Sequence, residues 1–547
     1  MLRVRPCQTL SLQTRDGVRL DADVYYPDGV GPWPVLLMRQ PYGRSIASTV
    51  VYAHPTWYAA HGYIVVIQDV RGRGTSEGEF QLFAHEREDG VDTVNWAAAL
   101  PDSTGTVGMY GFSYQGMTQL YAAIDLPPAL KTLCPAMVGY DLYADWAYEG
   151  GAFCLQANLG WAIQLAAETA RLQGKEPSFL ALAAAARNLP LSGPIAAQPQ
   201  ILQDLAPDSF YHDWLAHPQP DDYWEQLSPC RDFQPVDLPM LHIGGWFDTY
   251  LRGTLHLYRE MVERSSQFQF LLVGPWAHLP WGRRVGAVDF GPEAANPIDR
   301  LQIRWFDQFL KEQDRGVLAE LPISLFEMGS NCWRSFDRWP QPPDRHFFLS
   351  SSGLAALQEQ DGQLLNTLPK ADAIDVFVHD PWRPVPALGG HAAIPSGMVD
   401  RAALDCRSDV LTYTTPPLTT DLSLLGEITV ELWCSADAPS FDLCAVLSDV
   451  HPHGQVFNLT QGYIRVAPGQ PTSPLIISLQ ATCARLPIGH AVRLSLSAAC
   501  FPAYPVNPGT GTLPTEARAM EARIITVTVH SGPDCPSSVR FYPAEPC

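Results

Sequence analysis

The sequence predicts an α/β protein with an inserted helical segment and a C-terminal domain of β-strands, and three observations support this prediction. Short apolar runs alternate with a helical pattern in the first third of the chain. The segment from about residue 140 to 235 is rich in Ala, Leu, Gln and Trp. Beyond about residue 321, apolar and polar residues alternate as they do in half-buried strands. Because 547 residues exceed what one core accommodates, we expect two or three domains.

In the first third of the chain, strand and helix patterns alternate, which predicts a mostly parallel sheet. Its apolar runs are short and bounded by Gly, Pro or charged residues, which suits strands buried on both faces. Glu86–Leu100 carries apolar residues near helical spacing between two of these runs, giving a β-α-β order. The sheet resumes after the inserted segment. The predicted strands are Val35–Met38, Ile64–Gln68, Val107–Tyr110, Leu238–Ile243 and Phe268–Val273.

Two further regions differ from this sheet. Trp161–Leu172 and Phe179–Arg187 have helical patterns and are followed by a proline-rich stretch, which indicates a helical cap. The C-terminal region alternates apolar with polar residues and has Gly/Pro turns, as in Ile428–Trp433, so we expect a β-sandwich of the jelly-roll type. The predicted domains are therefore a core of residues 1–140 and 236–320, a cap of residues 141–235, and a jelly roll of residues 321–547.

Composition excludes several classes of function. The 36 basic and 57 acidic side chains give a net charge of −21, and such a surface repels nucleic acid. No run approaches the roughly 18 apolar residues of a membrane span, and the first 20 residues are too polar for a signal peptide. The 12 cysteines lack metal or redox spacing, so we expect reduced thiols in a cytoplasmic protein.

Gly111-Phe112-Ser113-Tyr114-Gln115-Gly116 follows the third apolar run. A serine hydroxyl is a weak nucleophile until a turn exposes it and a base removes its proton. Glycines on both sides of a serine, between a strand and a helix, permit the sharp turn of a nucleophile elbow. Gln115 stands where the usual signature has glycine, and Gly116 comes one residue later. Taken alone, the motif is equally consistent with a Gly/Ser-rich loop.

A nucleophilic serine needs a base and an acid, which in the α/β-hydrolase order follow it at the ends of later strands. Asp248 follows predicted strand 238–243 and His278 follows strand 268–273, each on a turn with a glycine and a tryptophan. Open α/β sheets place their sites at the carboxyl ends of strands. We therefore expect Ser113 to attack an acyl carbon, His278 to transfer its proton, and Asp248 to orient the imidazole.

The oxyanion of the tetrahedral intermediate needs hydrogen-bond donors. The backbone N–H of Tyr114, the residue after the nucleophile, is the first expected donor. The loop after the first buried strand lacks a glycine-rich stretch of the lipase type, but Tyr42 offers a phenolic O–H as the second donor.

Each of these residues also has an ordinary structural interpretation. A histidine such as His278 is more often packed or exposed than catalytic, and an aspartate such as Asp248 often caps a helix. Tyr42, beside a proline, could be a turn aromatic. The order Ser113, Asp248, His278 at three strand ends favours the catalytic interpretation over these.

These motifs resemble the family of cocaine esterase, α-amino acid ester hydrolases and X-Pro dipeptidyl-peptidases, over nearly the whole chain. In that family the serine is followed by Tyr-x-Gly, so Gln115 fits the family's own form. The resemblance implies a hydrolase core, a helical cap, a C-terminal jelly roll and a tyrosine hydroxyl in the oxyanion hole at Tyr42. It rests on Pro41-Tyr42, residues 69–78, residues 111–116, Trp246-Phe247-Asp248 and residues 274–278.

Specificity is less well defined by the resemblance. The α-amino ester hydrolases hold the substrate ammonium with carboxylates, two of them just beyond the triad aspartate, and residues 249–252 here are Thr-Tyr-Leu-Arg. Asp145 or Glu149 could supply one charge, or each could be a solvated or structural carboxylate. Trp146, Phe153 and Trp161 lie early in the cap, where they line an apolar acyl pocket or form part of the cap core.

Two other motifs are set aside. Residues 72–78, Gly-Arg-Gly-Thr-Ser-Glu-Gly, lack the spacing of a nucleotide-binding loop. His451-Pro452-His453 has no further ligands nearby in sequence, so we expect a surface loop and neither metal nor cofactor. The sequence thus predicts a serine hydrolase for a small-molecule ester substrate. Amide or peptide cleavage (an X-Pro dipeptidyl-peptidase or an acylase) and a jelly-roll binding protein are the alternatives, and homo-oligomerisation is left open.

Overall fold

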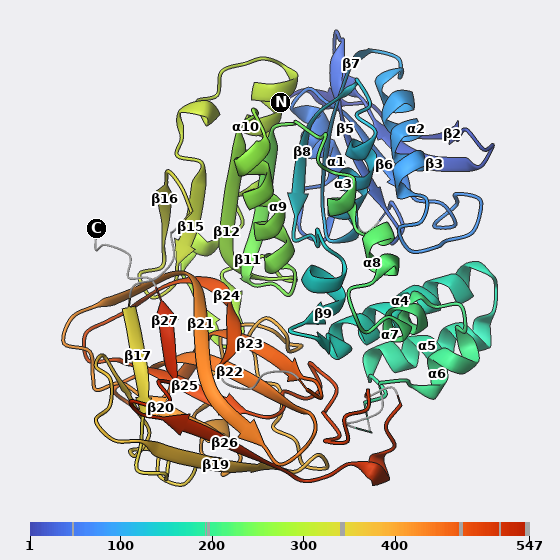
Figure 1. Cartoon of the computed structure of the whole chain (residues 1–547). Helices are drawn as coiled ribbons and strands as arrows, with labels where there is room; N and C mark the ends of the chain where they lie inside the picture. The colour runs from blue at the N-terminus through green and yellow to red at the C-terminus, as the bar shows by residue number, and fades with distance from the viewer. Residues whose placement is uncertain are drawn as a thin grey trace.

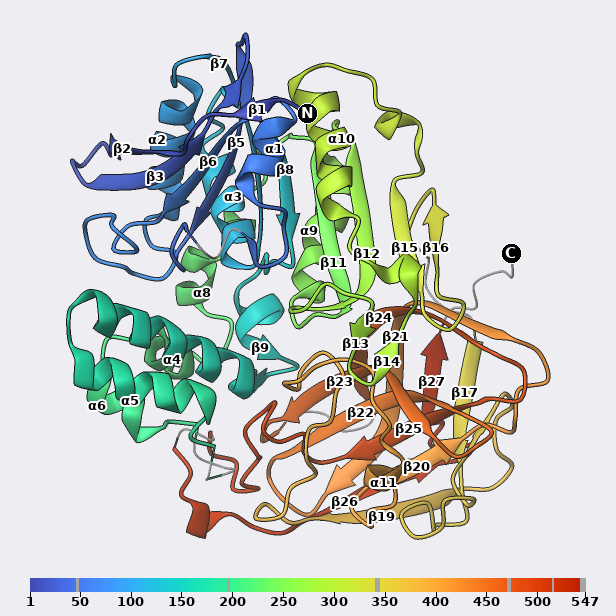
Figure 2. The same ribbon diagram turned by 180° about the vertical axis from the view of Figure 1, so that it is seen from behind.

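The computed structural model describes residues 1–45, 49–191, 193, 197–339, 345–469, 474–513 and 516–541. The chain forms three parts that meet at one junction (Figures 1 and 2). A sheet flanked by helices lies at the top of Figure 1, a group of helices lies below it, and a domain of strands lies beside that group.

Within the described residues, ten strands form the sheet of the core, in the order β16-β15-β12-β11-β8-β7-β5-β6-β3-β2. The strands from β6 to β15 run parallel, whereas β16 pairs antiparallel with β15, β3 with β6, and β2 with β3. This arrangement confirms the predicted α/β class. The strands are β2 (Gln8–Gln13), β3 (Arg19–Tyr25), β5 (Trp33–Gln40), β6 (Ile64–Asp69), β7 (Ser103–Phe112), β8 (Leu130–Ala136), β11 (Met240–Phe247), β12 (Gln269–Ala277), β15 (Ile323–Glu327) and β16 (Cys332–Phe336).

Alternate side chains of the inner strands enter two different helical layers. Leu37 of β5 packs in a cluster with residues of α2, α3 and α9, whereas Leu36 packs in a second cluster with residues of α1 and α10. Because both faces are covered, the strands read as continuous apolar runs, which is why the sequence revealed them. The helices are α1 (Pro55–Ala60), α2 (Glu86–Ala98), α3 (Tyr114–Ile124), α9 (Leu251–Arg264) and α10 (Ile298–Leu310).

The inserted segment between β8 and β11 is helical, as predicted. Its two longest helices contain the predicted ranges, and a short hairpin of β9 and β10 precedes them. The elements are β9 (Tyr148–Glu149), β10 (Ala152–Phe153), α4 (Leu155–Leu172), α5 (Glu176–Arg187), α6 (Gln200–Leu205), α7 (Phe210–Ala216) and α8 (Asp222–Leu227).

The C-terminal part is mostly antiparallel strand. Burial alternates along β21 and β26, as the period-2 pattern predicted, while the jelly-roll connectivity stays a prediction. One short helix, α11 (Ala402–Asp405), interrupts the strands. These are β17 (Arg345–Ser350), β18 (Gln363–Leu365), β19 (Ala373–His379), β20 (Leu411–Thr414), β21 (Leu422–Ala436), β22 (Phe441–Val450), β23 (Val456–Val466), β24 (Leu475–Leu486), β25 (Ala491–Ser497), β26 (Ile525–Ser531) and β27 (Ser538–Phe541).

The core sheet extends beyond the predicted boundary at residue 320. β15 pairs in parallel with β12, and β16 pairs with β15, so both strands belong to the core and not to the C-terminal domain. The sequence placed them in that domain because a strand pattern shows which residues are buried but not which sheet the strand joins.

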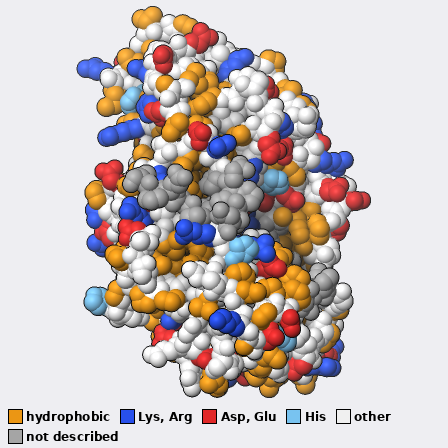
Figure 3. Space-filling model, turned by 60° about the vertical axis from the view of Figure 1, so that its left-hand side comes forward, with side chains coloured by type: hydrophobic (Ala, Val, Ile, Leu, Met, Phe, Trp, Pro, Cys, Tyr) orange, Lys and Arg blue, Asp and Glu red, His pale blue; other side chains and the backbone are white. Residues whose placement is uncertain are grey.

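No helix in the described part of the chain combines the length and the apolar character that crossing a membrane requires. The eleven described cysteines are free thiols. Acidic and basic side chains are interspersed on the face shown in Figure 3, so the excess negative charge forms no single patch on that face.

The three parts of the chain meet at a buried carboxylate. Glu149 of β9 accepts hydrogen bonds on Oε2 from Arg252 Nη1 of α9 (2.5 Å) and from two groups of the C-terminal domain, His391 Nε2 (2.9 Å) and the Tyr504 hydroxyl (2.6 Å). The Arg252 guanidinium and these hydrogen bonds outweigh the effect of burial, and the pKa of Glu149 lies well below its ordinary value of 4.5. One ionised oxygen thus joins the core, the cap and the C-terminal strands.

We expect Glu149→Gln to lower the free energy of unfolding at neutral pH by about 3 kcal/mol, because it leaves a buried guanidinium without its counter-charge. Since the folded-state pKa is below the unfolded value, the stabilisation is complete above about pH 4.5 and is lost as the pH falls through the folded-state pKa. Denaturant unfolding followed by tryptophan fluorescence should therefore show a difference between wild type and variant that shrinks only below about pH 4.5.

The matched control is Glu168→Gln, which removes a carboxylate paired with Arg171 on the outer side of α4. Exposed pairs of this kind contribute about 0–1 kcal/mol. Equal losses in both variants would contradict a special role for the Glu149 junction.

Candidate active site

Asp248 and His278 lie side by side because the ladder of β11 and β12 shifts by one residue after the pair Gly245–Gly274 and then ends level on both strands. The strands continue further than the sequence indicated, and the pair Phe247–Ala277 is the last of the ladder. Asp248 therefore directly follows β11, and His278 directly follows β12. Asp248 Oδ1 lies 2.8 Å from His278 Nδ1, and the carboxylate is fully buried while the imidazole remains partly exposed. The structure thus brings together two of the three residues that the sequence proposed as a triad.

Ser113 occupies a strained turn between β7 and α3. Its φ of 58° and ψ of −127° lie outside the regions that non-glycine residues ordinarily adopt. A Cβ on Gly111 would meet Gln115 Cβ at 2.4 Å, and one on Gly116 would meet Val138 Cγ1 at 2.3 Å. Close approach of α3 to the strands therefore requires glycine at both positions. This explains why Gly116, three residues after the serine, takes the role of the motif's second glycine.

His278 lies next to this turn. The imidazole packs against the ring of Phe112, the residue before Ser113, with the ring centroids 5.5 Å apart. Among the described residues, no hydrogen bond joins the Ser113 hydroxyl to His278. Hydrogen bonds of catalytic groups are often long without substrate and shorten in the complex.

The Tyr114 side chain anchors the start of α3. Its hydroxyl donates to Glu86 Oε1 (2.6 Å), and Glu86 Oε2 in turn accepts a hydrogen bond from Arg39 (2.7 Å). All three side chains are buried, so this hydrogen-bond network holds the turn of Ser113 on its buried side. The Tyr114 backbone N–H is the first of the helix, and no hydrogen bond occupies it within the described residues. Such an N–H at a helix start is suited to bind a negative charge.

Tyr42 packs against the side chain of Tyr114. Its ring contacts that of Tyr114 with centroids 6.5 Å apart, and its hydroxyl oxygen accepts a hydrogen bond from Trp161 Nε1 (3.0 Å). Burial raises the pKa of Tyr42 to about 12, so the phenol keeps its proton at neutral pH. Tyr42 is therefore in contact with the residue whose backbone N–H is the other expected oxyanion donor.

The three aromatic residues proposed for an acyl pocket have different surroundings. Trp146 packs on Trp161 (5.3 Å between centroids) and on Tyr250 (4.1 Å). Tyr250 in turn packs its edge against His278 (4.9 Å), so both tryptophans connect to the active-site residues. Phe153 packs instead on Tyr148 and Tyr211, inside the cap.

Comparison with known proteins places this arrangement in a family. Residues 16–280 match the model of the X-Pro dipeptidyl-peptidase (S15 family), and residues 309–540 match that of the X-Pro dipeptidyl-peptidase C-terminal non-catalytic domain. The chain is 31% identical to the cocaine esterase of Rhodococcus sp. (strain MB1 Bresler), over 96% of each protein. The chain belongs to the X-Pro dipeptidyl-peptidase S15 family. It is a serine hydrolase, and the resemblance stated from the sequence is confirmed.

Solved structures support the same fold over the whole length. An aminopeptidase from a Thaumarchaeota archaeon has a TM-score of 0.82 at 24% identity, covering 98% of this chain and 96% of that one. An α-amino acid ester hydrolase has a TM-score of 0.81 at 23% identity, covering 99% and 97%. The core, the cap and the C-terminal strands are thus shared with both structures.

The C-terminal domain contacts the active-site turn directly. Gln480 of β24 donates its Nε2 hydrogens to the backbone oxygens of Trp246 (2.9 Å) and Asp248 (3.2 Å). The hydroxyl of Thr249, next to Asp248, donates to the backbone oxygen of His391 (2.7 Å). The sequence analysis missed Gln480 because it lies in an ordinary strand pattern, more than 200 residues from the turn that it holds.

Asp145 and Glu149 are structural carboxylates. Asp145 Oδ2 accepts hydrogen bonds from the backbone N–H of Tyr140 and Asp141 and contacts His256 Nδ1 (2.9 Å). Glu149 joins the three parts of the chain as described above. Each carboxylate binds these internal partners through one oxygen, Oδ2 of Asp145 and Oε2 of Glu149, which gives both side chains a structural role.

The loop at residues 72–78 is also structural. A Cβ on Gly74 would meet Asp69 Oδ2 at 1.9 Å, and that carboxylate pairs with Arg44 (2.5 Å). Arg73 is buried over the ring of Phe80, 3.7 Å from its centroid, and donates to the backbone oxygen of Leu165 in the cap. Burial lowers the pKa of Arg73 to about 10. Gly74 thus serves close packing against an acidic side chain, an environment that is unsuited to a phosphate.

We expect Gln480→Leu to lower kcat/KM for p-nitrophenyl butyrate about tenfold, because the turn that carries Asp248 loses two of its hydrogen bonds. The control is Ser478→Ala, an exposed position on the same strand. Circular dichroism should show both variants folded. An unaltered kcat/KM in the Gln480 variant would mean that the turn holds Asp248 without help from the C-terminal domain.

Proposed function

We propose that the protein hydrolyses esters of a small, mostly uncharged acyl group through a covalent acyl-enzyme on Ser113. The observation that carries this proposal is the Asp248–His278 hydrogen bond at the paired ends of β11 and β12, beside the strained turn of Ser113. The 31% identity to a protein named cocaine esterase supports an ester substrate.

The proton path follows from the tautomer of His278. Its Nδ1–H donates to the Asp248 carboxylate, which leaves the Nε2 lone pair to take the proton of Ser113. The serine oxygen forms a bond to the acyl carbon, and His278 then gives the proton to the leaving alkoxide. A water molecule then gives a proton to His278 and attacks the acyl carbon. The serine oxygen leaves and takes that proton, which releases the acid and the free serine. Asp248 stays ionised throughout and stabilises the imidazolium.

The oxyanion is bound by two donors in this proposal, the Tyr114 N–H and the Tyr42 O–H. An indole nitrogen only donates, so Trp161 Nε1–H occupies the oxygen of Tyr42 and leaves its proton for the substrate. Trp161 thus orients the phenol as well as bordering the site. Trp161 also provides an apolar surface for the acyl group, whereas Trp146 and Phe153 are 1% and 2% exposed and belong to the buried core.

Peptide or amide cleavage is the second candidate, and the match to the X-Pro dipeptidyl-peptidase family favours it. The internal hydrogen bonds of Asp145 and Glu149 speak against it, because dipeptidyl substrates carry a free ammonium that needs a carboxylate partner. A small-molecule partner and a cytoplasmic location form part of the same proposal.

A fluorophosphonate probe should label the folded protein on the peptide that contains Ser113. We expect Ser113→Ala to abolish labelling without changing the fold, and Asp248→Asn to slow labelling because the imidazole loses its orientation. The measurement is mass spectrometry of the digested protein. Absence of labelling on folded wild-type protein would favour the third candidate, a binding protein on a hydrolase scaffold.

Comparing p-nitrophenyl butyrate with Gly-Pro-p-nitroanilide separates the two enzymatic candidates. We expect kcat/KM to be higher for the ester. Because esters are easier to hydrolyse than amides, the rate of anilide hydrolysis is the decisive measurement. Rapid release of p-nitroaniline would establish dipeptidyl-peptidase activity instead.

We expect Tyr42→Phe to lower kcat about 100-fold with little change in KM, because the O–H stabilises charge that develops only in the transition state. Steady-state kinetics with the butyrate ester measures this. Tyr143→Phe is the control, since its hydroxyl donates to Pro218 within the cap. If kcat of the Tyr42 variant is unaltered, Tyr42 is not an oxyanion donor.

A further inference from the structure

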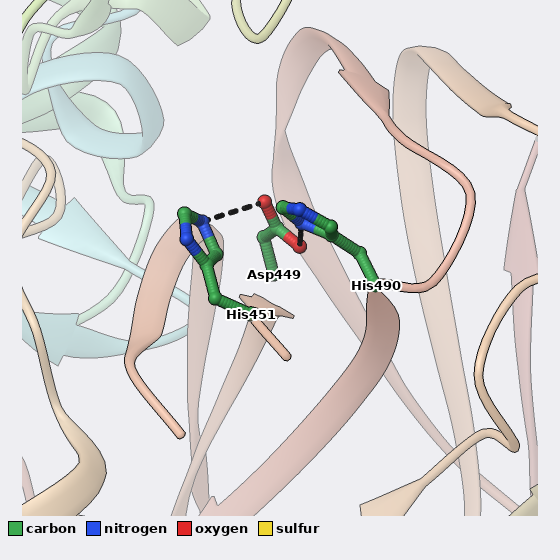
Figure 4. A group of neighbouring side chains, drawn as sticks. All are labelled: Asp449, His451 and His490. Carbon is green, nitrogen blue, oxygen red and sulfur yellow. Dashed lines mark hydrogen bonds and ion pairs between the residues drawn. The ribbon is translucent and has the colours of Figure 1, made fainter. Parts of the chain in front are cut away.

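A second cluster of reactive side chains lies in the C-terminal domain (Figure 4). Asp449 is the penultimate residue of β22, His451 begins the turn to β23, and His490 directly precedes β25. The β22–β25 ladder ends with the pair Val450–Ala491, which brings His490 to the end of β22. Asp449 and His451 are two residues apart, a spacing that puts side chains on one face of an extended chain.

The three side chains converge on one small region. Asp449 Oδ1 lies 2.8 Å from His490 Nδ1, and Asp449 Oδ2 lies 3.2 Å from His451 Nε2. One ligand-type atom from each residue lies within 4.8 Å of the other two. Figure 4 shows the carboxylate between the two rings, whose centroids are 4.4 Å apart.

The cluster is buried on one side and open on the other. The Asp449 and His490 side chains are 9% and 16% exposed, and His451 is 31% exposed. Within the described residues no Lys or Arg pairs with Asp449, so its partly buried negative charge faces only the two imidazoles. A hydrated cation could therefore reach the cluster from the side of His451 and would find there an uncompensated carboxylate.

The separations suit a coordinated ion. Metal–ligand bonds of about 2.0–2.1 Å at tetrahedral angles put neighbouring ligand atoms about 3.3 Å apart. The two nitrogen–oxygen separations, 2.8 and 3.2 Å, are near that value but involve different oxygens of Asp449, so the carboxylate would bind the ion through both oxygens or turn slightly to present one of them. Two imidazoles and one carboxylate favour zinc and other first-row divalent ions, whereas calcium and magnesium prefer more oxygen ligands.

We propose that Asp449, His451 and His490 bind one divalent transition-metal ion, with a water molecule at the open position. The ring nitrogens that now contact the carboxylate become the ligands, so each ring carries its proton on its other nitrogen, Nε2 of His490 and Nδ1 of His451. The ion ties the β22–β23 turn to the segment before β25 and thereby stabilises the C-terminal domain. This site differs from the surface loop expected from sequence, and His453, the other histidine of that motif, is not part of it.

The test uses the full chain after chelator treatment, titrated with ZnCl₂ in a calorimeter. We expect one saturable equivalent, and affinity at least about tenfold weaker in His451→Gln and in His490→Gln. Zinc should raise the thermal midpoint of the wild type but not that of either variant. His451 lies on an exposed turn, so its variant is expected to fold, which circular dichroism checks.

Two controls separate this site from other binding. His453→Gln alters an exposed histidine of the same turn, and His217→Gln removes a comparable histidine–aspartate pair in the cap, so both should bind zinc as the wild type does. Exposed cysteines such as Cys332 also bind zinc, and a Co²⁺ spectrum with a thiolate charge-transfer band would assign the ion to them. That band, no saturable equivalent, or unchanged binding in His490→Gln would each overturn the proposal, leaving only a hydrogen-bonded cluster.

Discussion

The register of two parallel strands is the constraint on which the proposed active site depends. β11 and β12 end their ladder at the same level, so the residues that follow them, Asp248 and His278, form a hydrogen bond without any long loop. The same edge of the sheet carries the turn of Ser113 at the end of β7. A parallel sheet places the carboxyl ends of its strands on one edge, so Ser113 and His278 lie at the same edge although they are 165 residues apart in the chain.

The strained backbone conformation of Ser113 is maintained because contacts on several sides hold it in place. The glycines at 111 and 116 let the helix approach the strands, and the buried Tyr114–Glu86–Arg39 network holds the first residue of α3. Strained backbone of this kind is maintained only when neighbouring contacts leave it no alternative. The Tyr114 side chain therefore serves the elbow, while its backbone N–H is the group proposed to act on the substrate.

The cap and the C-terminal domain both contact residues of the proposed active site. Trp161 of the cap donates a hydrogen bond to the hydroxyl of Tyr42, and Gln480 of the C-terminal domain holds the backbone oxygens of Trp246 and Asp248. Glu149 then links all three parts through one buried carboxylate oxygen. A domain described as non-catalytic in the family thus has a direct structural connection to the turn that carries the proposed acid.

Residue patterns were enough to predict the α/β class, the helical cap, the strand-rich C-terminal region and the family, because burial leaves periodic patterns and the Ser113 motif is local. These patterns also indicated Asp248 and His278, because a polar residue that directly follows an apolar run can be recognised in the sequence. Tertiary structure alone decided that β15 and β16 join the core, that Asp145 and Glu149 are occupied by internal partners, and that Gln480 supports the site. It alone joined His451 to Asp449 and His490. Each of these depends on which segments become neighbours, and pairing between distant strands leaves no signal in the spacing of residues along the chain.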